Sequence, residues 1–243
     1  MSKNISKQPK WKRGLENKQE SNYHKKIENI LKKLSPQYTN SIPFLLMDRR
    51  NLSKALIRIE LFKKILEIPG YIIECGTYRG NGLGLLLNLS SIYEPFNYNR
   101  KIIAFDTFKG FKNVSNQDPK NACDGDLNDT DIKVIENSIN AMDLHRPIGH
   151  VKKVELINGD ACTTIPKYVK DNPHLIVSFL YLDFDIYSPT KVALEHFMGL
   201  IPKGGIIAFD EFAQKKWAGE TIAYKELFNI DKFELKKFSF DPH

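Results

Sequence analysis

The chain has 243 residues, 42% of them hydrophobic and 27% charged, which is enough for one large α/β domain with its own core. No apolar run reaches the length of a membrane span, and the charged start lacks the apolar segment of a secretory signal. The three scattered cysteines favour neither a disulfide framework nor a zinc site. These features exclude fibrous, membrane-spanning and disulfide-rich classes, and they predict a cytoplasmic location.

The positive charge of the chain is confined to its N-terminal part. Residues 1–40 contain ten Lys or Arg and three Asp or Glu, a net charge of +7, which equals that of the whole chain. The whole chain has 36 basic and 29 acidic side chains, so the residues after 40 contain 26 of each and their charges cancel. A basic arm can contact nucleic acid or anionic lipid, but a solvated terminus is the simpler explanation. The neutral remainder argues against a nucleic-acid partner.

Helical periodicity appears first at residues 22–34 and again at 52–67, where Pro69-Gly70 ends the second helix. From residue 71, apolar strands alternate with amphipathic helices. The strands are expected at 71–75, 101–106, 154–158, 175–183 and 205–210, and the helices between them near 81–91, 131–142, 163–170 and 189–200. This order predicts a mostly parallel sheet with helices on both faces.

The end of the chain continues with a helix near 219–228 and with aromatic-rich, strand-like segments around 232–240. These segments would add an antiparallel edge to the sheet. The polar stretch 112–130 is expected to form a long surface loop, and loops of that length are often functional. We therefore divide the chain into a basic arm with an amphipathic helix, residues 1–40, and an α/β domain, residues 41–243.

A glycine-rich turn follows the first strand. The run from Tyr71 to Gly82 has the pattern of a strand, a turn and a helix start. Gly76 lets the backbone approach a ligand closely, and Gly80 and Gly82 permit an unusual turn. The spacing is neither that of the dinucleotide-binding fingerprint nor that of a P-loop. By itself the turn is a weak signal, because packing between strand and helix explains a single glycine equally well.

Acidic residues stand at the ends of four successive strands. Asp106 ends the second strand, where an acid in doubly wound folds accepts hydrogen bonds from ribose hydroxyls. Asp160 follows the third strand, and it either faces a ligand or caps the helix after it. Ligands bind outside the carboxyl ends of strands in open α/β sheets. The repetition of acids at these ends therefore favours a binding site.

Two pairs of carboxylates are the most informative part of this pattern. Asp183 and Asp185 follow one apolar strand, and Asp210 and Glu211 follow the next. Carboxylate oxygens suit the hard cations Mg²⁺, Mn²⁺ and Ca²⁺. Because strand side chains alternate, Asp183 and Asp185 would share a face if the strand continues that far. A turn position without function remains the rival explanation for Asp185.

The order of these motifs resembles the macrocin O-methyltransferase (TylF-type) family, over roughly residues 45–230. The most specific segment is Asp-x-Asp-x-Tyr-x-Pro-Thr, from Asp183 to Thr190. The other matching motifs are Glu74-Cys75-Gly76 with Arg79-Gly80, Phe105-Asp106-Thr107-Phe108 with Gly110-Phe111, Gly159-Asp160-Ala161, and Gly204-Gly205 with Asp210-Glu211. The resemblance implies a Rossmann-like class I methyltransferase fold with a mostly parallel seven-stranded sheet, helices on both faces and an N-terminal helical extension.

Members of that family are enzymes that depend on S-adenosylmethionine and Mg²⁺ and methylate sugar hydroxyls, so the resemblance implies residue roles. The methionine part of the cofactor would contact Glu74, Gly76, Thr77, Tyr78 and Gly80, the ribose Asp106, Thr107 and Phe108, and the adenine Asp160 and Ala161. The metal would be held by Asp183, which would also border the cofactor, and by Asp210 and Glu211. Asp185 would be the general base. Two departures are Glu211, where the family often has Asp, and Thr77-Tyr78, where it often has an aliphatic–aromatic pair.

These groups suit the reaction, because a sugar hydroxyl is a very weak acid. A bound cation stabilises the developing alkoxide, and a carboxylate can take the proton. The expected partner is a sugar-containing acceptor, such as a nucleotide sugar, a polysaccharide residue or a glycosylated natural product. Catechol-like small molecules are an alternative acceptor class. A second alternative function is that of an RNA methyltransferase, which would use the basic arm to bind RNA. His145, His150, His174 and His196 are alternative bases, and the sequence leaves a homodimer open.

Overall fold

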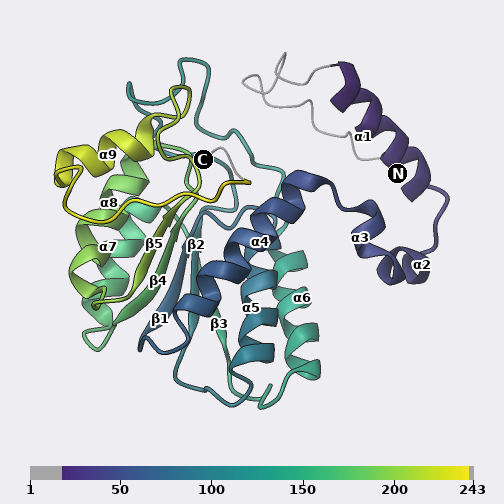
Figure 1. The fold of residues 1–243 in the computed structure, drawn as a ribbon, viewed down its shortest axis with the longest axis horizontal. Helices are drawn as coiled ribbons and strands as arrows, with labels where there is room; N and C mark the ends of the chain where they lie inside the picture. Colours follow the sequence, from purple (N-terminus) through teal and green to yellow (C-terminus); the bar gives the residue numbers. More distant parts are fainter. Residues whose placement is uncertain (1–17, 241–243) are drawn as a thin grey trace.

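A parallel sheet lies between two layers of helices (Figure 1). The computed structural model describes residues 18–240, so the first 17 residues of the expected basic arm lie outside the described part. The strands are β1 (Tyr71–Cys75), β2 (Ile102–Asp106), β3 (Val154–Asn158), β4 (Val177–Leu182) and β5 (Ile206–Phe209). All neighbours pair in parallel in the order β3-β2-β1-β4-β5. The carboxyl ends of all five strands therefore meet at one edge.

Helices cover both faces of the sheet (Figure 1). One layer contains α4 (Arg49–Lys64), α5 (Asn81–Tyr93) and α6 (Ile132–His145), and the other α7 (Ala161–Asp171), α8 (Tyr187–Phe197) and α9 (Gly219–Leu227). A short 3₁₀ turn, Met198–Leu200, follows α8. The N-terminal helices α1 (Lys18–Leu31), α2 (Pro36–Ser41) and α3 (Pro43–Leu46) stand apart from the sheet. None of the helices described is long and apolar enough to cross a membrane.

The alternation of side chains along the strands divides the core in two. Ile72 of β1 and Phe179 and Tyr181 of β4 pack on the side of α4 and α5, whereas Ile73 and Leu180 pack on the side of α7 and α8. All five are almost completely buried. Continuing this period of two, the residues at positions 74 and 183 fall on the α4 side. Two acids are thereby directed toward a helix rather than toward solvent.

Our expectation of a seven-stranded sheet was wrong: the described residues form five strands. The segment around 232–240, expected as an antiparallel edge, forms no strand. Its aromatic side chains pack on one another and on the end of α9, as in the pairs Phe228–Phe233 and Phe238–Phe240. Alternating aromatics are compatible with a strand, but a strand also needs hydrogen bonds to a neighbouring backbone. That segment does not make them with β5.

Gly76 marks the tightest approach in the sheet. It follows β1 with φ +92°, and a Cβ atom there would lie 1.9 Å from the carbonyl oxygen of Asp183. The amide of Asp183 donates to the carbonyl of Cys75 over 2.8 Å, and the amide of Gly76 donates to the carbonyl of Phe105 over 2.9 Å. The turn after β1 is thus held directly against the backbone that follows β4.

We expect Gly76→Ala to lower the free energy of unfolding by several kcal/mol, because the methyl group meets backbone and the φ angle is unfavourable for any residue with a Cβ atom. Urea denaturation measures the change. Gly84→Ala on α5 is the matched control: its Cβ would have no atom within 4 Å, and alanine favours a helix by about 1 kcal/mol. Equal stability of the Gly76→Ala variant and the wild type would contradict this reading of the turn.

Candidate active site

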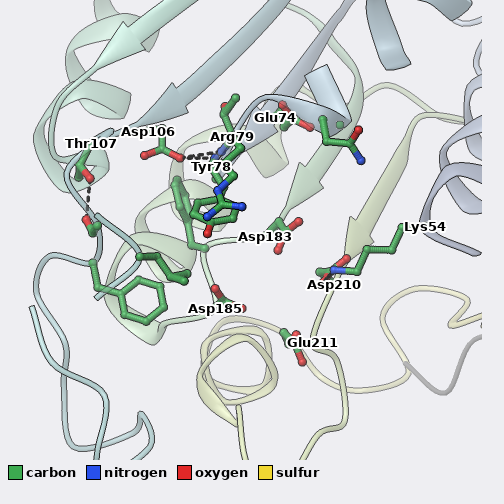
Figure 2. Close-up of a pocket in the computed structure, with 18 of the residues that line it drawn as sticks. Lys54, Glu74, Tyr78, Arg79, Asp106, Thr107, Asp183, Asp185, Asp210 and Glu211 are labelled. Atoms are coloured by element: carbon green, nitrogen blue, oxygen red, sulfur yellow. Dashed lines mark hydrogen bonds and ion pairs between the residues drawn. The ribbon is translucent and has the colours of Figure 1, made fainter. Parts of the chain in front are cut away.

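A cavity of about 670 Å³ opens at the carboxyl ends of the strands. The turn after β1, the ends of β2 and β3 and the acids after β4 and β5 all line it, together with the first half of α4. Figure 2 shows the acids of β4 and β5 on one side and the glycine turn with Asp106 on the other. The sequence-predicted residues that line the cavity are Glu74, Gly76, Thr77, Tyr78, Asp106, Thr107, Asp160, Ala161, Asp183, Asp185, Asp210 and Glu211.

Asp106 holds the glycine turn in place. Its Oδ2 accepts the amides of Thr77 and Tyr78 over 2.8 and 2.7 Å, and its Oδ1 accepts the amide of Phe108 over 2.7 Å (Figure 2). Tyr78 and Phe108 have positive φ angles of 47° and 50°, which non-glycine residues rarely adopt. Burial raises the pKa of the Asp106 carboxyl, although these hydrogen bonds favour its ionised form. The carboxylate therefore orders the backbone around the cavity.

Asp160 caps a helix and lines the cavity at once. Its Oδ1 accepts the amide of Cys162 over 2.9 Å at the start of α7, and its Oδ2 accepts the side-chain amide of Asn113 over 2.8 Å. Asp160 therefore caps the helix and also faces the cavity, which Ala161 beside it lines as well. The bond from Asn113 fastens the long loop 112–130 to the third strand end.

Two residues expected at the cofactor do not line the cavity. Phe108 is 6% exposed and packs in the core on the α5 side. Gly80, with φ +81°, is the N-cap of α5, and its amide donates to the carbonyl of Thr77 over 2.9 Å. Both residues support the turn without lining the cavity. Sequence spacing does not distinguish this supporting role from contact with a ligand.

The four acids after β4 and β5 reach the cavity by different routes. Asp183 directly follows the last residue of β4, and Asp210 the last residue of β5. Asp185 does not continue the strand: its φ of +62° places it in a turn. The condition for a shared strand face is therefore not met, and the turn aims the Asp185 side chain into the cavity instead (Figure 2). Such strain is common at functional sites.

Two cations from α4 meet this acid cluster, which we define as Asp183, Asp185, Asp210 and Glu211. The Nζ of Lys54 lies 2.5 Å from Oδ2 of Asp210. Arg58 lies one turn later, 3.5 Å from Asp183 and 3.8 Å from Glu74, with its guanidinium 3.9 Å from the ring centroid of Tyr181. Sequence analysis missed both cations. Their signal was a pair of basic residues four positions apart, which lie on the same face of a helix.

Burial sets the charge state of the acids. It raises the pKa of Glu74 to about 8, against the attraction of Arg58, and it raises the pKa of Asp183 to about 6, with Asp210 adding to the shift. Burial and then Asp210 raise the pKa of Glu211 to about 8. Burial also acts on Asp210, but the attraction and hydrogen bond of Lys54 outweigh it and lower the pKa of that carboxyl. Asp210 is thus the fixed negative charge of the cluster.

The acid cluster fits a divalent cation by its chemistry, because all its donors are hard carboxylate oxygens. Within residues 18–240, however, no three His, Cys, Asp or Glu side chains are arranged to hold a metal ion. One reason is visible: Oδ1 of Asp210 accepts the Tyr181 hydroxyl over 2.8 Å, and Oδ2 faces Lys54. The donors are suitable, but one of them is already paired with an ammonium group.

Buried polar contacts fix the walls around Asp185. Asp118 of the long loop accepts the amide of Tyr187 over 2.8 Å at the start of α8, and the amide and hydroxyl of Ser115 over 2.7 and 2.8 Å. Trp217 is buried, and its ring lies 5.9 Å from that of Phe111, centroid to centroid. The long loop 112–130 is therefore tied to the start of α8, close to Asp185.

None of the histidines considered as bases lines the cavity. His145 and His150 lie at and beyond the end of α6, His174 bonds to the hydroxyl of Tyr71, and His196 bonds to the carbonyl of Val192. The histidine that does line it is His24 of α1, whose Nε2 lies 3.3 Å from the guanidinium of Arg50. The N-terminal helix α1 therefore contributes to the wall of the cavity.

We expect the unfolding free energy to depend on pH through Glu74. Because the folded pKa of about 8 exceeds the unfolded value of 4.5, the folded state binds the extra proton between these values, and stability falls as the pH rises through them. Glu74→Gln should remove up to about 1.4 kcal/mol per pH unit of that fall. Urea denaturation at several pH values measures it. Glu60→Gln, an exposed site on α4, should keep the wild-type profile, and parallel profiles for all three proteins would refute the assignment.

The chain is similar to known proteins over most of its length. The family model for macrocin-O-methyltransferase (TylF) matches residues 47–236. The structure of CalS11, described as a calicheamicin methyltransferase, is 30% identical and has a TM-score of 0.87, with 94% of this chain and 91% of that chain covered. The apo structure of CalS11, described as TDP-rhamnose 3'-O-methyltransferase, is 28% identical with a TM-score of 0.81, and the shares covered are 94% and 93%.

A more distant structure shares the fold alone. The O-methyltransferase NovP is 17% identical with a TM-score of 0.58, and 73% of each chain is covered. No curated protein sequence matches the chain significantly. The family match extends from the start of α4 to beyond α9 and so includes most of the cavity. The chain is therefore an O-methyltransferase that belongs to the macrocin-O-methyltransferase (TylF) family.

Proposed function

We propose that this enzyme transfers a methyl group from S-adenosylmethionine to a hydroxyl of a sugar-containing acceptor, with Mg²⁺ bound by the acid cluster. The observation that carries the proposal is that the glycine turn after β1 and the acids after β4 and β5 line one cavity. We assign the methyltransferase unit to residues 41–243 and treat residues 1–40 as an arm beside it. The family membership supports the reaction class.

The donor half of the cavity would be built by β1, β2 and β3. S-adenosylmethionine supplies a methyl group that is already electrophilic, so the protein has mainly to align it. The cofactor would lie beside Gly76, Thr77 and Tyr78, which line the cavity together with Glu74 near the end of β1. The ribose would lie toward Asp106 and Thr107, and the adenine toward Asp160 and Ala161. Gly80 and Phe108 would act through the shape of the turn.

The acceptor half would be built around Asp185. Burial raises the pKa of the Asp185 carboxyl well above its usual range, and a carboxylate with a raised pKa is a stronger base for an acceptor hydroxyl. Mg²⁺ held by Asp183, Asp210 and Glu211 would stabilise the alkoxide that forms. The strained backbone at Asp185 and the Asp118 bond to α8 hold the base in position.

A sugar acceptor is favoured by the similarity to CalS11, whose description names a sugar substrate. CalS11 is described as acting on TDP-rhamnose, and it covers 94% of this chain at 28% identity. Cations at the α1 and α4 side of the cavity, Arg50 and Lys54, are compatible with an acceptor that carries phosphate. Incubation with TDP-rhamnose and, in parallel, with a catechol, with release of S-adenosylhomocysteine as the readout, compares the two acceptor classes.

We expect S-adenosylhomocysteine to bind the purified protein in isothermal titration calorimetry. Asp160→Ala should weaken that binding by about tenfold, because the variant loses both the carboxylate proposed for the adenine and the cap of α7. Asp171→Asn, at the exposed end of the same helix, serves as the control and should bind as the wild type does. Absence of binding with and without Mg²⁺ would refute the donor assignment.

Asp185→Asn should lower kcat by about 10²- to 10⁴-fold, because the amide cannot accept the hydroxyl proton. The affinity for S-adenosylhomocysteine should change little, since Asp185 is proposed to act on the acceptor rather than on the donor. Steady-state kinetics with the acceptor that the screen identifies, and calorimetry with S-adenosylhomocysteine, measure the two quantities. Full activity of Asp185→Asn would remove this residue from the mechanism.

A further inference from the structure

Lys54 and Arg58 bring two cations to the acid cluster from one face of α4, but they differ in freedom of movement. Arg58 is 5% exposed, and its guanidinium is enclosed by Tyr181, Glu74 and Asp183. The side chain of Lys54 is 45% exposed at the cavity. An ammonium group on a flexible four-carbon stem can move back into water, whereas a stacked, buried guanidinium cannot. Only Lys54 can therefore move away from the acid cluster.

Both oxygens of the carboxylate that Lys54 contacts already have a partner. Asp210 has a side chain only 7% exposed, and its Oδ1 accepts the hydroxyl of Tyr181 in the core. Its Oδ2 is the oxygen turned to the cavity, and the Nζ of Lys54 lies 2.5 Å from it (Figure 2). A cation that arrives from the cavity therefore reaches Asp210 through Oδ2.

An ammonium group and a divalent cation cannot use this oxygen in the same way. Mg²⁺ binds carboxylate oxygens at roughly 2.0–2.1 Å and needs nearly ideal geometry. With Lys54 in place, the two positive charges would lie within a few ångströms of each other in a partly buried site, where their repulsion is strong. Within the described residues no three carboxylates are arranged to hold a metal, and Asp210 is the one paired with Lys54.

We propose that Lys54 is a built-in competitor for the metal: its ammonium group occupies Oδ2 of Asp210, and a divalent cation binds the acid cluster only as Lys54 withdraws into the cavity. The inference rests on the proposed metal dependence and adds a residue that sets metal affinity. In the metal-free protein Lys54 balances the charge of Asp210 and keeps the cluster compact. Metal binding then exchanges one cation for another and changes the surroundings of Lys54.

Direct metal binding tests the competition. Mn²⁺ takes the same oxygen ligands as Mg²⁺, and electron paramagnetic resonance reports its free concentration. In full-length protein saturated with S-adenosylhomocysteine, Lys54→Met should bind Mn²⁺ about tenfold more tightly than the wild type, the size expected when one close ion pair no longer competes. Lys63→Met, on the same helix and paired with Glu60 at 3.2 Å, should leave the affinity unchanged. Equal or weaker binding by Lys54→Met would overturn the proposal.

A second measurement needs no substitution, in case Lys54→Met does not fold. Acetylation of the wild-type protein by acetic anhydride, followed by mass spectrometry, gives the relative reactivity of each lysine. Saturating Mg²⁺ should increase the acetylation rate of Lys54 several-fold, because the amine loses its ion pair, and should leave that of Lys63 unchanged. A rate at Lys54 that stays constant or falls on addition of Mg²⁺ would refute the exchange.

The outcomes separate this inference from the proposed function. If the wild type and Lys54→Met bind Mn²⁺ equally, the role of Lys54 fails and the metal dependence stands. If no variant binds Mn²⁺, both the metal dependence and the competition are refuted. The titration with S-adenosylhomocysteine still decides the methyl donor in that case, because the glycine turn and Asp106 are not members of the acid cluster (Figure 2).

Discussion

The guanidinium of Arg58 lies where α4, β1 and β4 meet, between Glu74 and Asp183 and over the ring of Tyr181. Carboxylates at the ends of adjacent strands are costly to bury together, because each loses its hydration and repels the next. A guanidinium keeps its charge at any ordinary pH and can face several acids at once. Arg58 thus makes a buried acid cluster compatible with a folded sheet. It also fixes the rotation of α4, and that rotation brings Lys54 to Asp210 one turn earlier.

The same edge of the sheet joins two functions that the chain encodes far apart. The turn after β1 and the backbone after β4 touch at Gly76, where a side chain would collide with the carbonyl of Asp183. A cofactor held by the turn and a hydroxyl held by the acids would therefore lie side by side, which is the requirement for methyl transfer. Asp106 secures the turn by accepting three backbone amides, so the donor side is ordered by the protein itself.

The acceptor side depends on contacts among loops rather than on strands. Asp118 ties the loop 112–130 to the start of α8, two residues after Asp185, and Gly219 at the start of α9 packs so closely on Asp118 and Tyr187 that a Cβ would lie 2.7 Å from each. Trp217 closes this junction against Phe111. Three segments distant in sequence thus fix the position of one carboxylate. Loops that carry function are commonly held by a few buried bonds of this kind.

The sequence by itself determined the alternation of strands and helices, the parallel sheet and the acids at the strand ends, because hydrophobic period and strand termini are local properties. Most of the site residues that it named do line the cavity. Only the tertiary structure decided the rest. Five described strands form the sheet, because the aromatic segment near 232–240 packs on itself and on α9 instead of on β5. Asp185 reaches the cavity because its backbone is left-handed, and Phe108 faces the core. The cations of α4 meet Asp183 and Asp210, which lie more than a hundred residues away in the sequence. Such pairings depend on how one helix lies on the sheet, which no local pattern contains.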